Sequence, residues 1–163
     1  MNTAVNTNTS VVTADMLTHL PERAQRYLIY TGVVGQPRIN TVSVKYTGIF
    51  RLAAEKPWTP IKAEQVYTTN PPGFQWKARL KMAGLWIFSG SDTYESGQGH
   101  MFGKVAGLYT IFDERGAELD QGTMVRYLNE MMWFPIALLS DYITWQAVND
   151  RSFDVTFTDC GKS

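Results

Sequence analysis

Two charged residues lie one helical turn apart in an otherwise apolar stretch, RYLNEMMWFPIALLS, at positions 126–140. Their i, i+4 spacing would make Arg126 and Glu130 stacked neighbours on a helix. In an enzyme, Glu130 could serve as a general acid or base and Arg126 could bind an anion. In a structural role, the two would form a buried or rim ion pair that fixes the helix to the fold. Trp133 follows on the same side of the helix, and so large an aromatic side chain argues against full exposure of that side.

Other chemistries are poorly supported by the residue types and their spacing. Cys160 has no histidine near it in the sequence, so nothing local would activate its thiol. His19 and His100 are the only histidines and show no metal-ligand spacing. The glycine-rich segment ESGQGHMFGK lies between two expected strands, where no helix N-terminus could hold a phosphate. We therefore predict neither a metal site nor a cofactor.

Composition indicates one globular domain. The chain has 163 residues, of which 44% are hydrophobic, and a formal net charge of zero. Such a balanced chain has no global field that would attract nucleic acid. The N-terminus lacks the features of a signal peptide, and no apolar run reaches the roughly 18 residues of a membrane span. We expect a cytoplasmic protein with a flexible leader over residues 1–14 and a single domain over residues 15–163.

Two helices are expected on either side of a strand-rich middle. In LPERAQRYLIYTG, Pro21 and Gly32 are typical of a helix start and stop, which predicts a helix from about Pro21 to Tyr30. A second helix is predicted over residues 119–133. Its apolar side would carry Met124 and Tyr127, while Arg126 and Glu130 would lie on the other side.

The middle of the chain alternates with the period of two that is typical of strands. The clearest case is FQWKARLKM, which predicts that Phe74, Trp76, Ala78 and Leu80 point toward the helices while Lys77, Arg79 and Lys81 face solvent. We place further aromatic residues on the same apolar face: Tyr46, Phe50, Trp86 and Phe88. Since this leaves the basic face without aromatic side chains on which bases could stack, we expect no nucleic-acid partner.

These patterns predict an α+β fold, in which a curved, half-barrel-like antiparallel sheet of roughly five to seven strands packs on two or more helices. The strand within FDVTFTDCGKS, near Phe153 to Thr158, has no return strand after it. We therefore expect it at a sheet edge, in a chain that lacks C-terminal strands.

Several motifs resemble an uncharacterised bacterial family, a domain of unknown function. The most specific are RYL-x-E-x-x-WFP-x-ALL, from Arg126 to Leu139, and NPPGF-x-W, from Asn70 to Trp76. The resemblance implies no established reaction. The expected architecture is similar to half-barrels of the lipoprotein-carrier type, which hold apolar ligands.

Three functional hypotheses follow. The favoured one is non-catalytic binding of a small apolar or amphipathic ligand on the concave apolar face of the sheet. Its candidate ligand-binding residues are Arg126, Glu130, Trp133, Trp76, Phe74, Tyr46 and Tyr94. The second is an enzyme that uses Glu130 as acid or base and Arg126 as an anion clamp, with Asp92, Tyr94 or His100 across the mouth of the site. The third is an interaction module that pairs through an open sheet edge.

The third hypothesis carries its own test. An edge strand presents unpaired backbone N–H and C=O groups, so we expect the chain to self-associate through it or to expose apolar surface beside it. Analytical ultracentrifugation should detect dimers or larger species, or a hydrophobic dye should bind the folded protein. A monomer that binds no dye would contradict this expectation.

Overall fold

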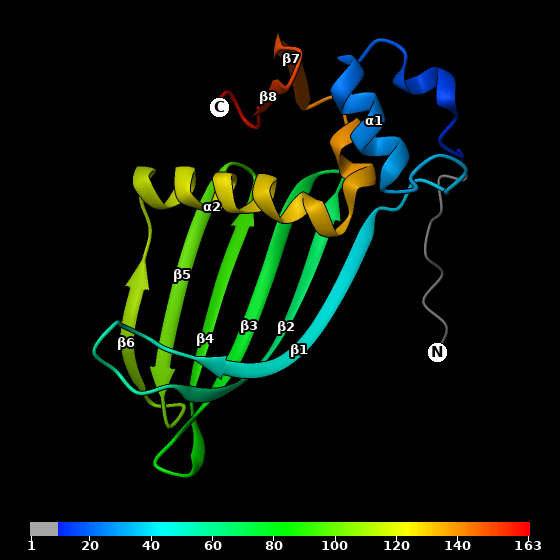
Figure 1. Cartoon of the computed structure of the whole chain (residues 1–163). Coiled ribbons are helices and arrows are strands. Elements are labelled where there is room, and N and C mark those ends of the chain that lie inside the picture. Colours follow the sequence, from blue (N-terminus) through cyan, green and yellow to red (C-terminus); the bar gives the residue numbers. More distant parts are fainter. Residues whose placement is uncertain (1–9) are drawn as a thin grey trace. The chain divides into compact units, whose positions relative to one another are not determined.

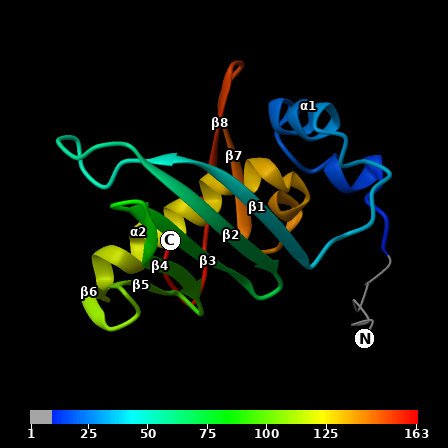
Figure 2. The same ribbon diagram turned by 90° about the horizontal axis from the view of Figure 1, so that it is seen from below.

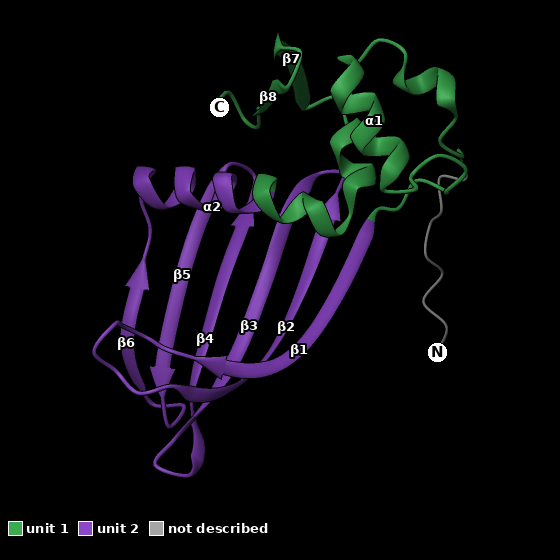
Figure 3. Cartoon of the chain, viewed as in Figure 1, with its two compact units in different colours: residues 1–40, 128–163 green, residues 41–127 purple. Residues whose placement is uncertain are grey.

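The chain divides into two compact units. The structure is a computed structural model that describes residues 10–163; the first nine residues of the expected leader lie outside the described part. Residues 41–127 form one unit, which we call the sheet unit. The chain up to residue 40 and residues 128–163 form the other, which we call the terminal unit (Figure 3).

The sheet unit is built on six antiparallel strands that follow one another in sequence order (Figure 1). Successive antiparallel strands can be joined by short turns, so the whole sheet forms as a series of hairpins. Because the sheet is not closed, its first and last strands are edges. The strands are β1 Thr41–Phe50, β2 Thr59–Thr69, β3 Pro72–Met82, β4 Leu85–Glu95, β5 Gln98–Val105 and β6 Tyr109–Glu114.

Alternation along β3 confirms the predicted orientation of its side chains. Phe74, Ala78 and Leu80 are buried, Trp76 is half-buried, and the lysine and arginine between them are exposed. The register places Tyr67 of β2 and Tyr94 of β4 beside Phe74 on the same face. We call this the apolar face and the opposite one the polar face. Figure 2 views the same curved sheet from below.

Trp86 departs from the predicted pattern. A register shift between Leu80 and Lys81 pairs Lys81 with Trp86, so that β4 holds one extra residue, as in a β-bulge. The ammonium nitrogen of Lys62, a residue of the polar face, lies 4.9 Å from the centre of the Trp86 ring. The prediction that Trp86 shares the apolar face with Phe88 is therefore wrong, because a bulge breaks the strict period of two on which it depended.

Helix α2, Ala117–Glu130, covers the end of the apolar face where β5 begins. The Gly99 amide of β5 donates to the Asp120 carboxylate at 2.8 Å, and the Tyr127 hydroxyl donates to the Thr68 carbonyl at 2.7 Å. Thr123, which lies between Asp120 and Tyr127 along the helix, is buried. The predicted helix over residues 119–133 is confirmed up to Glu130, after which the chain tightens into a 3-10 turn, η2, Met131–Trp133.

The terminal unit holds the first predicted helix. Helix α1, Glu22–Tyr30, begins directly after Pro21, as the sequence indicates, and buries Ala24 and Leu28. The unit also contains two further 3-10 turns, η1 Ala14–Leu17 and η3 Pro135–Leu139. Within the described part of the expected leader, Val12 is buried, and its backbone exchanges hydrogen bonds of 2.9 and 2.8 Å with Gln36 and Gly35.

The last two strands pair only with each other. Strands β7, Ile143–Asn149, and β8, Ser152–Phe157, form a two-stranded sheet of their own. The prediction that the strand near Phe153 lies at a sheet edge is confirmed, although this sheet is separate from the six-stranded one. Neither α1 nor α2, nor any other helix in residues 10–163, has the length and apolar character needed to cross a bilayer.

Gly99 allows the close approach of α2 to the sheet. A Cβ atom there would lie 2.6 Å from the Thr123 hydroxyl and 2.7 Å from the Leu119 carbonyl oxygen. We predict that Gly99→Ala lowers the free energy of unfolding by about 1–3 kcal/mol, because the helix would have to shift. Urea titration measures this loss.

Gly122 provides the matched control, since a Cβ there meets nothing within 4 Å. It lies inside α2, where alanine is favoured over glycine, so Gly122→Ala should raise stability by about 0.5–1 kcal/mol. Equal effects of the two substitutions would contradict the packing role of Gly99.

Candidate functional site

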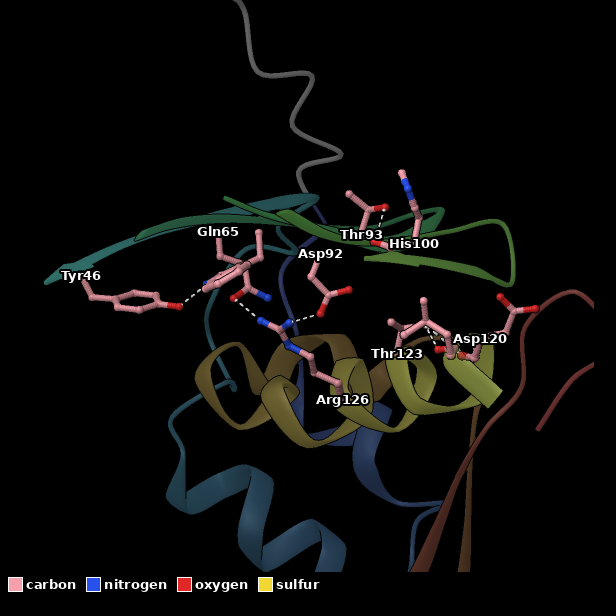
Figure 4. A network of polar contacts seen from close by, with 10 residues as sticks. Tyr46, Gln65, Asp92, Thr93, His100, Asp120, Thr123 and Arg126 are labelled. Carbon is pink, nitrogen blue, oxygen red and sulfur yellow. Dashed lines mark hydrogen bonds and ion pairs between the residues drawn. The ribbon is translucent and has the colours of Figure 1, made fainter. Parts of the chain in front are cut away.

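A charged network connects α2 to the apolar face of the sheet. Arg126 forms an ion pair through Nη1 with Oδ2 of Asp92 on β4, and its Nη2 donates to Gln65 Oε1 on β2 at 3.1 Å. Figure 4 shows the Arg126 side chain extending from the helix between these two partners. One guanidinium thus connects three elements. Its planar fork is suited to this, since it can donate in several directions at once.

Aromatic rings lie beneath the guanidinium. Its central carbon is 4.6 Å from the centre of the Phe74 ring and 5.7 Å from that of Trp76. A cation over an aromatic face is stabilised by the ring quadrupole. The indole N–H of Trp76 in turn donates to the Tyr46 hydroxyl on β1, and Tyr46 is 37% exposed. The network therefore runs from a buried centre to an accessible rim at the β1 edge.

Burial differs sharply across the network. The Asp92 side chain is only 7% exposed, whereas that of Arg126 is 28% exposed. Gln65 is fully buried. A buried carboxylate is costly unless a cation compensates it, which Arg126 does. The same cation remains accessible to solvent, so it can also meet a ligand.

The structure brings together Arg126, Phe74, Trp76 and Tyr46, four of the residues that the sequence predicts for a site. Tyr94, a fifth, is fully buried behind Phe74, with ring centres 6.4 Å apart, and is a core residue.

Glu130 and Trp133 belong to the terminal unit and are described with it. Glu130 is half-buried and Trp133 is 52% exposed, so neither side chain is fully exposed, although Trp133 keeps much of its ring accessible. The exposure has a local cause, because α2 ends at Glu130 and the following 3-10 turn carries Trp133 off the helical pattern used to place it.

Two further polar residues of the network had weaker sequence signals. Asp92 was a candidate for the mouth of the site, and Gln65 was not predicted. In both strands every second residue is mostly apolar, and Asp92 and Gln65 are polar exceptions. A polar residue at an apolar position of such an alternation is the signal that could have found Gln65. His100, another candidate, pairs with Thr93 next to Asp92, so it points to the polar face. There its ring nitrogens contact Asp113 at 2.6 Å and Arg115 at 3.0 Å.

The polar face carries a hollow of about 820 Å3 across five strands. Two cross-strand rows of side chains line it. One row is Thr47, Lys62, Arg79, Ser89 and Lys104; the other is Lys45, Glu64, Lys77, Ser91 and Phe102. Glu64 is the one acid among these lining residues of the described chain, and it pairs with Lys45 at 3.3 Å. With Trp86 and Phe102 on this side, the polar face is not free of aromatic rings, contrary to expectation.

Cys160, the single cysteine, belongs to the terminal unit. Cys160 is exposed, and its hydrogen bond to the Asp159 carboxylate, at 3.5 Å, raises the pKa of the thiol above its ordinary value. A raised pKa leaves less of the nucleophilic thiolate at neutral pH. Among residues 10–163, no group of three or more His, Cys, Asp or Glu side chains is placed to hold a metal ion.

The family suggested by the motifs is confirmed by a family model that matches residues 10–163. The chain belongs to the family of unknown function DUF6544. No curated protein and no solved structure matches this DUF6544 chain.

The Asp92–Arg126 pair should make a measurable contribution to stability. Asp92→Asn would leave a half-buried guanidinium without its carboxylate, which we expect to lower the free energy of unfolding by about 2–4 kcal/mol. The matched control is Glu64→Gln, which removes the solvent-exposed Lys45 pair and should cost less than about 0.5 kcal/mol. Chemical denaturation of both variants measures the difference. A loss in Asp92→Asn no greater than in the control would show that α2 docks without help from the pair.

Proposed function

We propose that the protein binds a small amphipathic ligand without catalysis, with the acidic head of the ligand on Arg126 and its apolar part along the aromatic rim. The observation that carries this proposal is a cation that stays 28% exposed while its carboxylate partner is nearly buried. A ligand carboxylate or phosphate could approach the accessible side of the guanidinium without displacing Asp92. Arginine suits such a role because its fork matches planar oxyanions.

The rim supplies the apolar contact. Trp76 is half-buried and Tyr46 is 37% exposed, so both offer ring surface beside Arg126. Ligand sites commonly combine such surface with a few fixed polar groups. The hydrogen bond between the Trp76 indole and the Tyr46 hydroxyl holds the two rings in place. A carrier-like half-barrel in the cytoplasm, as the sequence suggests, is compatible with this role and is part of the proposal.

The enzyme hypothesis has less support in the network around Arg126. An acid or base must be able to exchange a proton with a substrate. The carboxylate that an ion pair joins to Arg126 is that of Asp92, which is nearly buried, whereas Glu130, the acid or base of the enzyme hypothesis, belongs to the terminal unit. Ligand binding by Arg126 requires no proton exchange, so it explains the network around Arg126 with fewer assumptions than catalysis.

A paired-ligand experiment tests the proposal. Displacement of a fluorescent fatty-acid analogue should show binding of oleate and weaker binding of oleyl alcohol, which has the same chain without the charge. Arg126→Gln combined with Asp92→Asn removes both charges together, so no buried carboxylate is left unpaired. This double variant should bind oleate about tenfold more weakly and lose the preference over the alcohol.

Lys45→Gln, on the polar face, is the control and should bind oleate like the natural protein. Thermal melts would establish that each variant is folded. The proposal fails if the natural protein binds neither compound, or if the folded double variant keeps the full preference for oleate.

A further inference from the structure

Large apolar side chains are exposed at one end of the six-stranded sheet. Because antiparallel strands alternate in direction, the β1–β2, β3–β4 and β5–β6 turns lie at the same end, which is the lower end in Figure 1. Several large apolar side chains in or beside these turns are exposed, among them Leu108 at 80% and Leu85 at 63%. The group comprises Leu52, Trp58, Met82, Leu85, Leu108 and Tyr109. We call it the turn-end apolar group.

The turns at the opposite end of the sheet carry no such exposed apolar side chains in the described chain. There the β2–β3 turn is formed by Asn70 and Pro71 and the β4–β5 turn by Ser96 and Gly97. None of the large apolar residues exposed in the described chain lies in these two turns. Folded proteins seldom leave several large apolar side chains exposed together without a partner. The asymmetry therefore indicates that one end of the sheet contacts something apolar.

Positive charge accompanies the apolar group. Arg51 and Lys56 lie in the β1–β2 turn and Lys81 lies near the end of β3, against a single acid in these turns, Glu55. The Arg51 guanidinium lies 5.0 Å from the centre of the Trp58 ring, so charge and aromatic surface are in direct contact. Further along the strands, Lys62, Arg79 and Lys104 extend the positive charge into the hollow of the polar face.

We propose that this end of the sheet docks on the surface of a bilayer containing anionic lipids. The apolar side chains of the turns enter the boundary between headgroups and acyl chains, and Trp58 and Tyr109 occupy the interface that such rings favour. Arg51, Lys56 and Lys81 meet the lipid phosphates. A second copy of the chain fits less well, because a two-fold interface would bring the same cations face to face.

This inference does not depend on the proposed ligand site. The turn-end apolar group lies at the far end of the sheet from α2, which carries Arg126 (Figure 1). Bilayer docking can therefore fail while ligand binding succeeds, and the reverse.

Vesicle co-sedimentation tests the docking. The full chain should sediment with vesicles of phosphatidylcholine and phosphatidylglycerol, and more weakly with phosphatidylcholine alone. Leu85→Gln with Leu108→Gln should weaken binding to the anionic vesicles about tenfold, because two inserted side chains are lost. The matched control is Ile29→Gln with Val148→Gln, which alters two exposed apolar residues of the terminal unit and should bind unchanged.

A second pair of variants tests the charge. Arg51→Gln with Lys81→Gln should abolish the preference for anionic vesicles, whereas Arg26→Gln with Arg151→Gln, in the terminal unit, should preserve it. The proposal is overturned if the natural protein does not sediment with anionic vesicles, or if the turn variants bind as it does. It is also overturned if the protein is a dimer in solution that Leu85→Gln with Leu108→Gln separates, since the apolar group would then cover a second copy.

Discussion

The ion pair between Arg126 and Asp92 places two opposite charges on a face that otherwise carries apolar and aromatic side chains. The Asp92 carboxylate would be costly there alone, because burying it requires a compensating cation. The position of α2 that brings Arg126 over β4 supplies that cation. Gln65 and the Phe74 ring support the same position from β2 and β3. The guanidinium thus adds contacts to three strands beside those that Asp120, Thr123 and Tyr127 of α2 make with the sheet unit.

The position of α2 on the sheet determines which surfaces of the sheet unit stay exposed. Where α2 covers the sheet, Tyr67, Tyr94, Tyr127, Thr123 and Gly99 are used for packing, and the Arg126–Trp76–Tyr46 rim remains accessible. Away from the helix, the turns of β1–β2, β3–β4 and β5–β6 have no covering element within the described sheet unit. Their apolar side chains are exposed beside basic ones. One sheet therefore offers two chemically different surfaces, one at each end.

Much of the fold could be predicted from local patterns. The alternation in β3 correctly separated Phe74 and Leu80 from Lys77 and Arg79, because a strand places successive side chains on opposite faces. Pro21 correctly preceded α1. The errors arose where the local period is interrupted. Trp86 changed faces at a bulge, and the helix predicted to run to Trp133 ends at Glu130, where α2 gives way to a 3-10 turn.

By itself, the sequence determined the family, the α+β class and the alternation of β3, since periodicity and motifs are properties of neighbouring residues. Only the tertiary structure decided the partners. The i, i+4 spacing makes Arg126 and Glu130 neighbours on the helix, but it could not name the sheet residue that pairs with Arg126, which is Asp92, 34 positions earlier. The reason is physical: strand register and helix docking, rather than spacing along the chain, determine which distant polar groups share a low-dielectric environment.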